Sequence, residues 1–184
     1  LGYEKNFSWT CFEKISGFNI SIQYKTTAIN LNQLNQMTTS TGIIQFSKIN
    51  QPDISSGYTL DDNARALIAM CMYFKLTGDE KSLHYIKLYL SFIRFCLQPT
   101  GNFLNYVDKY NRFTDQNKTT NLDDSNGRAI WALGYLVSAK GFLPEEIMSE
   151  AILLIQKTMP HLETMYSTRA MAFTIKGLYY YHSV

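Results

Sequence analysis

The sequence predicts an all-α domain of α/α-hairpin repeats, arranged as an arc or a partial (α/α)6 toroid, with a small β-hairpin in one connecting loop. Helices that are apolar on nearly every side alternate along the chain with amphipathic helices. Each apolar helix also opens with a polar group followed by Arg-Ala, and this dipeptide recurs at 65–66, 128–129 and 169–170. Recurrence of one supersecondary unit is typical of helical repeat proteins.

Hydrophobic periodicity places each element in order. After a modest first helix, the expected helices are alternately buried and amphipathic, and they lie at 29–37, 61–76, 80–97, 125–139, 145–159 and from 167 onwards. Within the third helix, polar residues recur every three or four positions, which predicts one solvent-facing stripe: Glu80, His84, Lys87, Ser91, Arg94 and Gln98. The loops at 43–60 and 98–124 are longer than hairpin packing requires, and such loops are often functional.

We expect two regions. Residues 1–28 show no helical period and predict an irregular lead-in or linker, whereas residues 29–184 predict the helical domain. Three hairpins form only an arc of a six-hairpin ring. The chain is therefore expected to be either truncated or a reduced version whose ends pack on another surface, for which the terminal "YYYHSV" offers aromatic side chains.

Composition excludes several classes of function. The formal net charge is +2, from 17 basic and 15 acidic residues with no run of either sign, so neither nucleic acid nor an anionic membrane is expected as a partner. No apolar run is long enough for a membrane span. Cys11, Cys71 and Cys96 are odd in number, and the last two lie in apolar helical runs. These two predict buried free thiols in a reducing compartment.

No cofactor or metal ion is expected. His84, His161 and His182 are scattered without metal-ligand spacing. The chain also contains neither a Gly-rich phosphate loop nor a dinucleotide-binding fingerprint.

Two stretches place paired aspartates at the start of an apolar helix: "GYTLDDNARALI" (57–68) and "LDDSNGRAIWALG" (122–134). Buried helices of one repeat run parallel, so their first turns should meet at one end, about 8–10 Å apart. That spacing is close to the ~5–9 Å between the two carboxyl groups of a glycosidase. We expect Asp62 and Asp124 to react with or hold the substrate, and Asp61 and Asp123 to cap or orient them.

Neighbouring polar residues are candidates for substrate binding. Arg65, Arg128 and Asn63 are expected to position sugar hydroxyls or to keep the carboxylates ionised. Further candidates are Asn126, Tyr58, Gln45 and Tyr106. The structural alternative is that the aspartates only cap their helices, worth about 1 kcal/mol each, or pair with the arginine three or four residues later.

The stretch "GNFLNYVDKYNRF" (101–113) alternates well enough to predict the small β-hairpin. Its aromatic residues are expected either to wall a groove and stack on sugar rings or to pack on the helix ends: Phe103, Tyr106, Tyr110 and Phe113.

Four stretches, taken in order, carry a family resemblance: "GIIQFS" (42–47), 57–68, 101–113 and 122–134. From about residue 29 to its end, the chain resembles the helical domain of a group of bacterial proteins described as glycosyltransferases. In those proteins the domain follows a sugar-transferring domain and is similar to toroid glycosidases. The resemblance implies cytoplasmic action on oligosaccharide or polysaccharide, with a glycosyltransferase domain upstream as a partner.

The chain departs from this family at two positions. Phe46 and Asn126 stand where the family usually has histidine. If either histidine served as an acid or base, this protein would lack it. Three hypotheses therefore remain: glycoside hydrolysis by paired aspartates, a non-catalytic glycan-binding module, and a structural domain that packs on a transferase domain. Whether the domain is an enzyme is left open.

Overall fold

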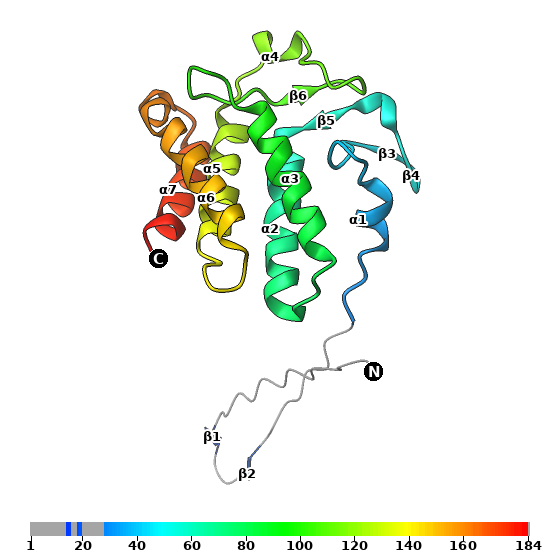
Figure 1. Ribbon diagram of the computed structural model, residues 1–184, viewed down its shortest axis with the longest axis vertical. Helices are drawn as coiled ribbons and strands as arrows, with labels where there is room; N and C mark the ends of the chain where they lie inside the picture. The colour runs from blue at the N-terminus through cyan, green and yellow to red at the C-terminus, as the bar shows by residue number, and fades with distance from the viewer. Residues whose placement is uncertain (1–13, 16–17, 20–27, 184) are drawn as a thin grey trace. The chain divides into compact units, whose positions relative to one another are not determined.

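A computed structural model describes residues 14–15, 18–19 and 28–183 (Figure 1). Contacts divide the chain into two units, residues 1–33 and 34–184, and each unit is described by itself. In the first unit, β1 (Lys14–Ile15) pairs antiparallel with β2 (Phe18–Asn19). Most of the lead-in expected at 1–28, including Cys11, lies outside the described residues.

The described chain is mostly helical, which confirms the predicted class at that level. Its helices are α1 (Asn32–Met37), α2 (Leu60–Thr77), α3 (Ser82–Cys96), α4 (Gln116–Thr119), α5 (Asp123–Val137), α6 (Glu145–Thr158) and α7 (Thr168–His182), with 3-10 turns η1 (Ile54–Ser56) and η2 (Met159–Thr164). The predicted helices agree with these within a few residues at each end. Only the single turn of α4, in the loop 98–124, was not expected.

The five long helices form two layers. Helices α2, α5 and α7 pack side by side in one row with α5 in the middle, while α3 packs on α2 and α6 packs on α5. In Figure 1, α2, α5 and α7 all begin at the end of the molecule that carries β5 and β6 and run away from it. The first turns of the three inner helices therefore lie at the same end.

Local capping explains where α2 begins and ends. Thr59 is its N-cap residue, and the Thr59 side-chain oxygen accepts from the backbone N–H of Asp62 at 3.2 Å. Gly78 ends the helix in the left-handed region with φ of 65°, and its N–H donates to Phe74 O. The aspartates stand inside the first turn and are not N-cap residues, in contrast to the capping alternative.

Helix α2 is less buried than its composition suggests. Its residues up to Cys71 pack as predicted, but Met72 is 55% exposed and Leu76 is 43% exposed. The prediction that the helix at 61–76 is buried on every side was therefore wrong for its last turns. One stripe, from Arg65 through Ala69 to these two residues, lies on the face of the inner row that no described helix covers. The predicted solvent-facing stripe is confirmed in part, since Glu80, His84, Lys87 and Arg94 are exposed but Ser91 and Gln98 are half-buried.

Helices α5 and α7 approach each other closely because glycines face backbone across their interface. A Cβ at Gly127 would lie 2.6 Å from Ala170 O, and one at Gly177 would lie 2.5 Å from Ile130 O. A Cβ at Gly134 would collide with Gly177 O. Small residues at this interface allow the two backbones to touch.

Both described cysteines are buried free thiols, as predicted. Cys71 and Cys96 lie in the core of the helical unit. Burial raises the pKa of the Cys71 thiol to about 12 and raises the pKa of the Cys96 thiol as well. Neither group is a reactive thiolate at neutral pH.

Short antiparallel pairings cover the end where the inner helices begin. β5 (Tyr58–Thr59) pairs with β6 (Tyr106–Val107), and single bridges join Ile44 to Tyr58 and Val107 to Phe113. A separate hairpin joins β3 (Ser47–Lys48) to β4 (Gln51–Pro52). The hairpin expected within 101–113 is thus reduced to one bridge and a tight turn, because β6 pairs with β5 instead.

Candidate functional site

One spacing recurs at the start of two inner helices and brings the predicted site together. An aspartate, an asparagine two residues later and an arginine two residues after that define a D-x-N-x-R motif: Asp61, Asn63 and Arg65 in α2, and Asp124, Asn126 and Arg128 in α5. In this register Asp61 corresponds to Asp124, although each belongs to a different position of its Asp-Asp pair. The two motifs lie on adjacent parallel helices.

The asparagine of the first motif ties a loop to its helix. Asn63 Nδ2 donates to Thr59 O at 2.8 Å, and its Oδ1 accepts from the backbone N–H of Ile43 at 3.0 Å. The side chain is fully buried. Gly42 is required beside it, because a Cβ there would collide with the amide oxygen.

The asparagine of the second motif makes the equivalent contacts. Asn126 Nδ2 donates to Leu122 O at 2.9 Å and to Phe103 O at 3.0 Å, and its Oδ1 accepts from the Phe103 N–H at 2.8 Å. Both asparagines were expected to bind substrate. The structure instead uses their amides to hold the loops that precede and cover the helices.

Asp61 lies between two arginines. Its Oδ2 accepts from the Arg65 guanidinium at 3.0 Å, and its Oδ1 lies 3.0 Å from an Arg128 nitrogen without hydrogen-bond geometry. Burial raises the pKa of the Asp61 carboxyl, against the attraction of both arginines and with a further upward contribution from the charges of Asp62 and Asp124. Asp61 and Asp124 are therefore within electrostatic range of each other.

The pKa of the Asp124 carboxyl is shifted in the opposite direction, below its usual value. Its Oδ1 accepts from Ser167 Oγ at 2.9 Å, and its Oδ2 pairs with the Arg169 guanidinium. The hydrogen bond from Arg169 holds the pKa of Asp124 below its usual value, with help from Ser167 and Arg128 and against partial burial. The carboxylate is 26% exposed, which leaves it accessible from solvent.

These contacts form an Asp–Arg ladder across the inner row. Asp61 of α2 pairs with Arg128 of α5, and Asp124 of α5 pairs with Arg169 of α7. Each carboxylate thus meets the arginine of the next inner helix. The third helix has Met165 four residues before its arginine, so it supplies no further carboxylate to the ladder.

Asp62 and Asp123 have structural contacts. Asp62 Oδ2 accepts from the hydroxyl of the N-cap residue Thr59 at 2.5 Å, and its Oδ1 pairs with Arg65 at 2.7 Å. Asp123 Oδ2 accepts from the backbone N–H groups of Tyr166 and Ser167 just before α7. The sequence interpretation gave the reacting role to Asp62 and the orienting role to Asp61. In the structure it is Asp61 that meets the arginine of the next inner helix, and the constant spacing from aspartate to asparagine and arginine was the signal available in the sequence.

The remaining predicted binding residues lie in the loops of this end. Tyr58 is buried, and its hydroxyl shares a hydrogen bond with Thr39 Oγ1 at 3.0 Å. Gln45 is half-buried, and its backbone N–H donates to Gly57 O. Tyr106 is half-buried in β6. The Tyr58 hydroxyl is thus already hydrogen-bonded within the fold.

The aromatic residues of the loop 101–113 separate into different environments. Phe103 is 0% exposed and belongs to the core, which agrees with the packing alternative and not with a groove wall. Phe113 stacks on Phe95 with ring centroids 4.9 Å apart. Tyr110 is exposed, with the cations of Lys109 and Arg112 each 5.0 Å from its ring centroid.

An aromatic cluster that sequence reasoning did not select lies beside the motifs. Trp131, three residues after Arg128, stacks on Phe173 of α7 with ring centroids 5.7 Å apart. The Arg128 guanidinium lies 4.8 Å from the Phe173 centroid, and Lys176 Nζ lies 3.9 Å from the Trp131 centroid. Helical spacing from the motif arginine could have indicated Trp131, but only the α5–α7 packing brings Phe173 and Lys176 to it.

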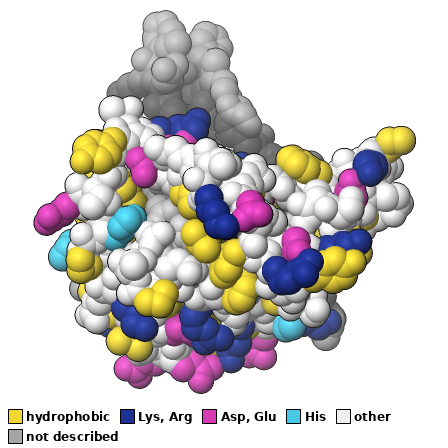
Figure 2. Space-filling model, turned by 90° about the horizontal axis from the view of Figure 1, so that it is seen from above, with side chains coloured by type: hydrophobic (Ala, Val, Ile, Leu, Met, Phe, Trp, Pro, Cys, Tyr) yellow, Lys and Arg dark blue, Asp and Glu magenta, His cyan; other side chains and the backbone are white. Residues whose placement is uncertain are grey.

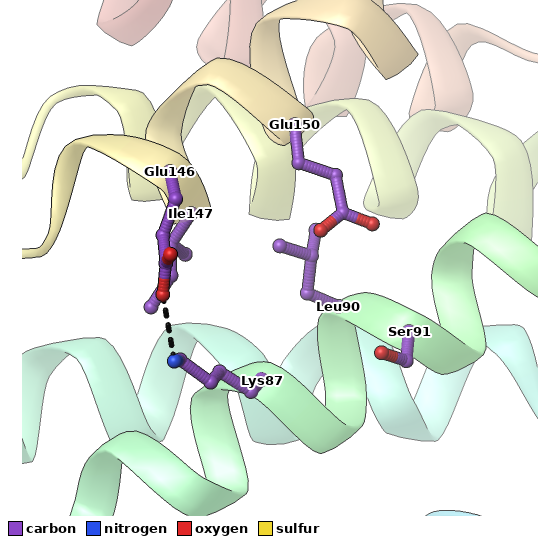
Figure 3. A pocket seen from close by; sticks show the side chains of 6 residues that line it. All are labelled: Lys87, Leu90, Ser91, Glu146, Ile147 and Glu150. Carbon is purple, nitrogen blue, oxygen red and sulfur yellow. Dashed lines mark hydrogen bonds and ion pairs between the residues drawn. The ribbon is translucent and has the colours of Figure 1, made fainter.

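Two clefts lie away from the motifs. The first, of about 260 Å³, separates α3 from α6 and is bridged by an ion pair from Lys87 to Glu146 at 2.8 Å (Figure 3). The second, of about 470 Å³, lies among the C-terminal ends of α5 and α7 and one face of α6. No motif residue lines either cleft, so the chemistry of the ladder does not belong to them.

Viewed from the end that carries β5 and β6, the surface shows acidic, basic and apolar side chains interspersed (Figure 2). Among residues 14–15, 18–19 and 28–183, no three His, Cys, Asp or Glu side chains are grouped so that they could hold a metal ion. In the same described part, none of the helices has the length and apolarity needed to cross a membrane.

No protein-family model matches the chain, and no curated protein matches it at a significant level. The functional proposal below therefore depends on the residues and the geometry of the site.

Proposed function

We propose that this domain acts on oligosaccharide or polysaccharide and that Asp61 and Asp124 carry out glycoside hydrolysis. One observation carries the proposal: two carboxyl groups at equivalent positions of adjacent parallel helices have pKa shifts in opposite directions. A pair of carboxyl groups with environments that separate their pKa values is the arrangement that assigns one as acid and the other as base.

In this mechanism Asp61 is the general acid, because burial favours its protonated form. It gives its proton to the departing glycosidic oxygen as the bond to the anomeric carbon breaks. Asp124 remains ionised, because Arg169 and Ser167 hydrogen-bond to the carboxylate. It either removes a proton from the attacking water or attacks the anomeric carbon itself. Arg128 lies beside Asp61 and contributes to the low pKa of Asp124.

The same proposal includes the wider context. An arc of an (α/α)6 toroid, a glycosyltransferase domain upstream and a cytoplasmic location come from the hairpin repeat and the family resemblance. The row of parallel inner helices with an outer layer supports the first of these. Oligosaccharide or polysaccharide is the proposed ligand, and Arg65 and Arg128 are the proposed contacts to its hydroxyls.

A non-catalytic glycan-binding module is the second candidate, and a specific observation favours it. Both carboxylates of the ladder are already paired with an arginine of the next helix. Paired carboxylates and guanidinium groups bind sugar hydroxyls well without performing proton transfer. Asn126 and Phe46, where the resembling family usually has histidine, point in the same direction.

A hydrolysis assay beside calorimetry, on one panel of α- and β-linked oligosaccharides, tests both candidates. Asp61→Asn and Asp124→Asn should each reduce kcat by about 100-fold or more, while binding is retained. Asp62→Asn is the matched control: it should cost about 1 kcal/mol of unfolding free energy through the lost cap contact and leave kcat unchanged.

The outcomes separate the hypotheses. Binding without turnover in the wild-type protein supports the glycan-binding module. Neither binding nor turnover supports a structural domain that packs on a transferase domain. Loss of activity in Asp62→Asn, with activity retained in Asp61→Asn, would restore the original assignment of the reacting carboxylate.

A further inference from the structure

Three polar atoms on the inner row are buried without a hydrogen-bond partner. They are Asp61 Oδ1, Arg128 Nε and Trp131 Nε1, and among the described residues only Thr114 Oγ1 shares this condition. Their side chains are linked by contact, because Asp61 meets Arg128 and both Arg128 and Trp131 lie against Phe173. Native proteins leave few such atoms unsatisfied. One acceptor and two donors therefore lie within a single cluster of contacting side chains, and a polar ligand could reach them only where these side chains move apart.

Lys176 adds a charge to this cluster. Its Nζ lies over the Trp131 ring, and within residues 28–183 it forms no ion pair with a carboxylate. By contrast, the arginines of the ladder are each paired with an aspartate. Lys176 is exposed, so its long side chain can move off the Trp131 ring when a negatively charged ligand binds.

The donors in this cluster outnumber the acceptors. Arg128 Nε, Trp131 Nε1 and the Lys176 ammonium can donate, whereas Asp61 Oδ1, which is ion-paired with Arg128 at 3.0 Å, is the one acceptor without a hydrogen bond. A ligand that fits must present mainly acceptors, one hydroxyl donor and a flat apolar face for the indole ring. A sugar that carries a carboxylate has all three features.

We propose that Trp131, Arg128 and Lys176 form a subsite for an acidic sugar residue of the glycan. The sugar carboxylate takes Lys176 off the Trp131 ring, and the exposed ring then stacks on the sugar. This inference rests on the proposed function, since it names the class of glycan that the Asp61–Asp124 site would bind. Exchange of a cation–π contact for a charge-assisted hydrogen bond to a carboxylate favours binding of the acidic sugar.

Fluorescence titration and calorimetry on the full chain test the proposal. The probes are galacturonate, glucuronate and mannuronate tetrasaccharides, each beside its fully methyl-esterified form, which carries no negative charge. The wild-type protein should bind at least one acidic probe about tenfold more tightly than its ester, with a change in tryptophan emission that is lost in Trp131→Phe. Lys176→Met should abolish this preference while retaining the binding of the ester.

A matched control is available at the other end of the inner row. Lys75 also lies over an aromatic ring, with its Nζ 5.3 Å from the Phe142 centroid. Lys75→Met should therefore leave the preference for the acidic probe unchanged. Trp131→Phe keeps an aromatic ring but removes the N–H, and it should weaken binding of both forms of the probe.

Each result of these binding experiments supports or overturns a stated proposal. Equal affinity for acid and ester, or an unchanged preference in Lys176→Met, overturns the subsite while leaving the proposed glycan function intact. Acid-selective binding without hydrolysis supports the subsite and overturns the catalytic proposal. Binding of no probe in the wild-type protein overturns the acidic-sugar subsite, and failure on the neutral panel as well would remove the glycan function.

Discussion

Asp61 and Asp124 occupy equivalent positions but experience different surroundings. Burial and a neighbouring carboxylate oppose the ionisation of Asp61, whereas Arg169 and Ser167 donate hydrogen bonds to Asp124. The pKa of one carboxyl is raised above 3.8 and that of the other is lowered below it. The active form of the proposed hydrolase has Asp61 protonated and Asp124 ionised.

The pH profile of kcat/KM should therefore be bell-shaped. Activity rises as Asp124 loses its proton, below pH 3.8, and falls as Asp61 loses its proton, above pH 3.8. Arg128→Met removes a positive charge that favours ionised Asp61, so it should move the alkaline limb to higher pH. An alkaline limb that stays in place or moves to lower pH in this variant contradicts the role of Asp61 as the acid.

The backbone conformation of Ile49 should lower the stability of the folded protein. Ile49 lies at the tip of the β3–β4 hairpin with φ of 59°, and its side chain is 96% exposed. A β-branched residue is strained in the left-handed region and gains nothing here from burial. Ile49→Gly should raise the unfolding free energy by about 1 kcal/mol in chemical denaturation. Ile54→Gly, at an exposed isoleucine without positive φ, should give no such gain.

At the scale of elements, hydrophobic periodicity was sufficient to place the helices. The alternation of buried and amphipathic segments predicts α2, α3, α5, α6 and α7 because each helix contacts its neighbours along a regular stripe. Periodicity does not reveal which faces remain uncovered. The last turns of α2 are apolar and yet exposed, since the inner row has a face without a covering helix.

The candidate site was predictable only in part. The sequence indicated that two acidic helix starts meet at one end, because parallel inner helices require it. It could not assign the partner of each carboxylate, since Ser167 and Arg169 lie more than forty residues from Asp124. It also could not separate Phe103, which is buried, from Tyr110, which is exposed, within one alternating stretch.

The interface between α5 and α7 should tolerate no added side chain. Gly134→Ala places a methyl group against Gly177 O and should reduce the unfolding free energy by about 2 kcal/mol or more, measured by chemical denaturation. Ala172→Leu adds a larger group on the exposed face of α7, the helix that packs against Gly134, and should cost less than about 0.5 kcal/mol. Equal effects of the two changes would show that the backbones do not touch.

In the described helical unit, α7 is the last helix of the inner row, and much of its surface is exposed. Only Ala170, Thr174 and Gly177 of this helix are buried, and they face α5. On another face, Met171, Ile175 and Tyr179 follow one another at helical spacing and are 40%, 68% and 70% exposed. An apolar stripe of this kind favours association with other surfaces.

Ile175→Lys should therefore reduce concentration-dependent self-association of the protein, measured by sedimentation velocity. The unfolding free energy should change by less than about 0.5 kcal/mol, because the side chain packs little in the folded protein. Leu153→Lys is the matched control, since Leu153 is 60% exposed, against 68% for Ile175, and lies on α6 outside this stripe. A similar effect of both changes would attribute any association to general hydrophobicity and not to the α7 face.

The Asp–Arg ladder also makes the inner row extensible by protein engineering. Each ion pair of the ladder joins a carboxylate from one hairpin to a guanidinium from the next. The same kind of ion pair therefore connects successive hairpins. A duplicate of residues 123–165 inserted before α7 would offer its own arginine to Asp124 and its own aspartate to Arg169. Length could then be added to this domain as a cassette once the contacts of Tyr166 and Ser167 to Asp123 and Asp124 are rebuilt at the new junction.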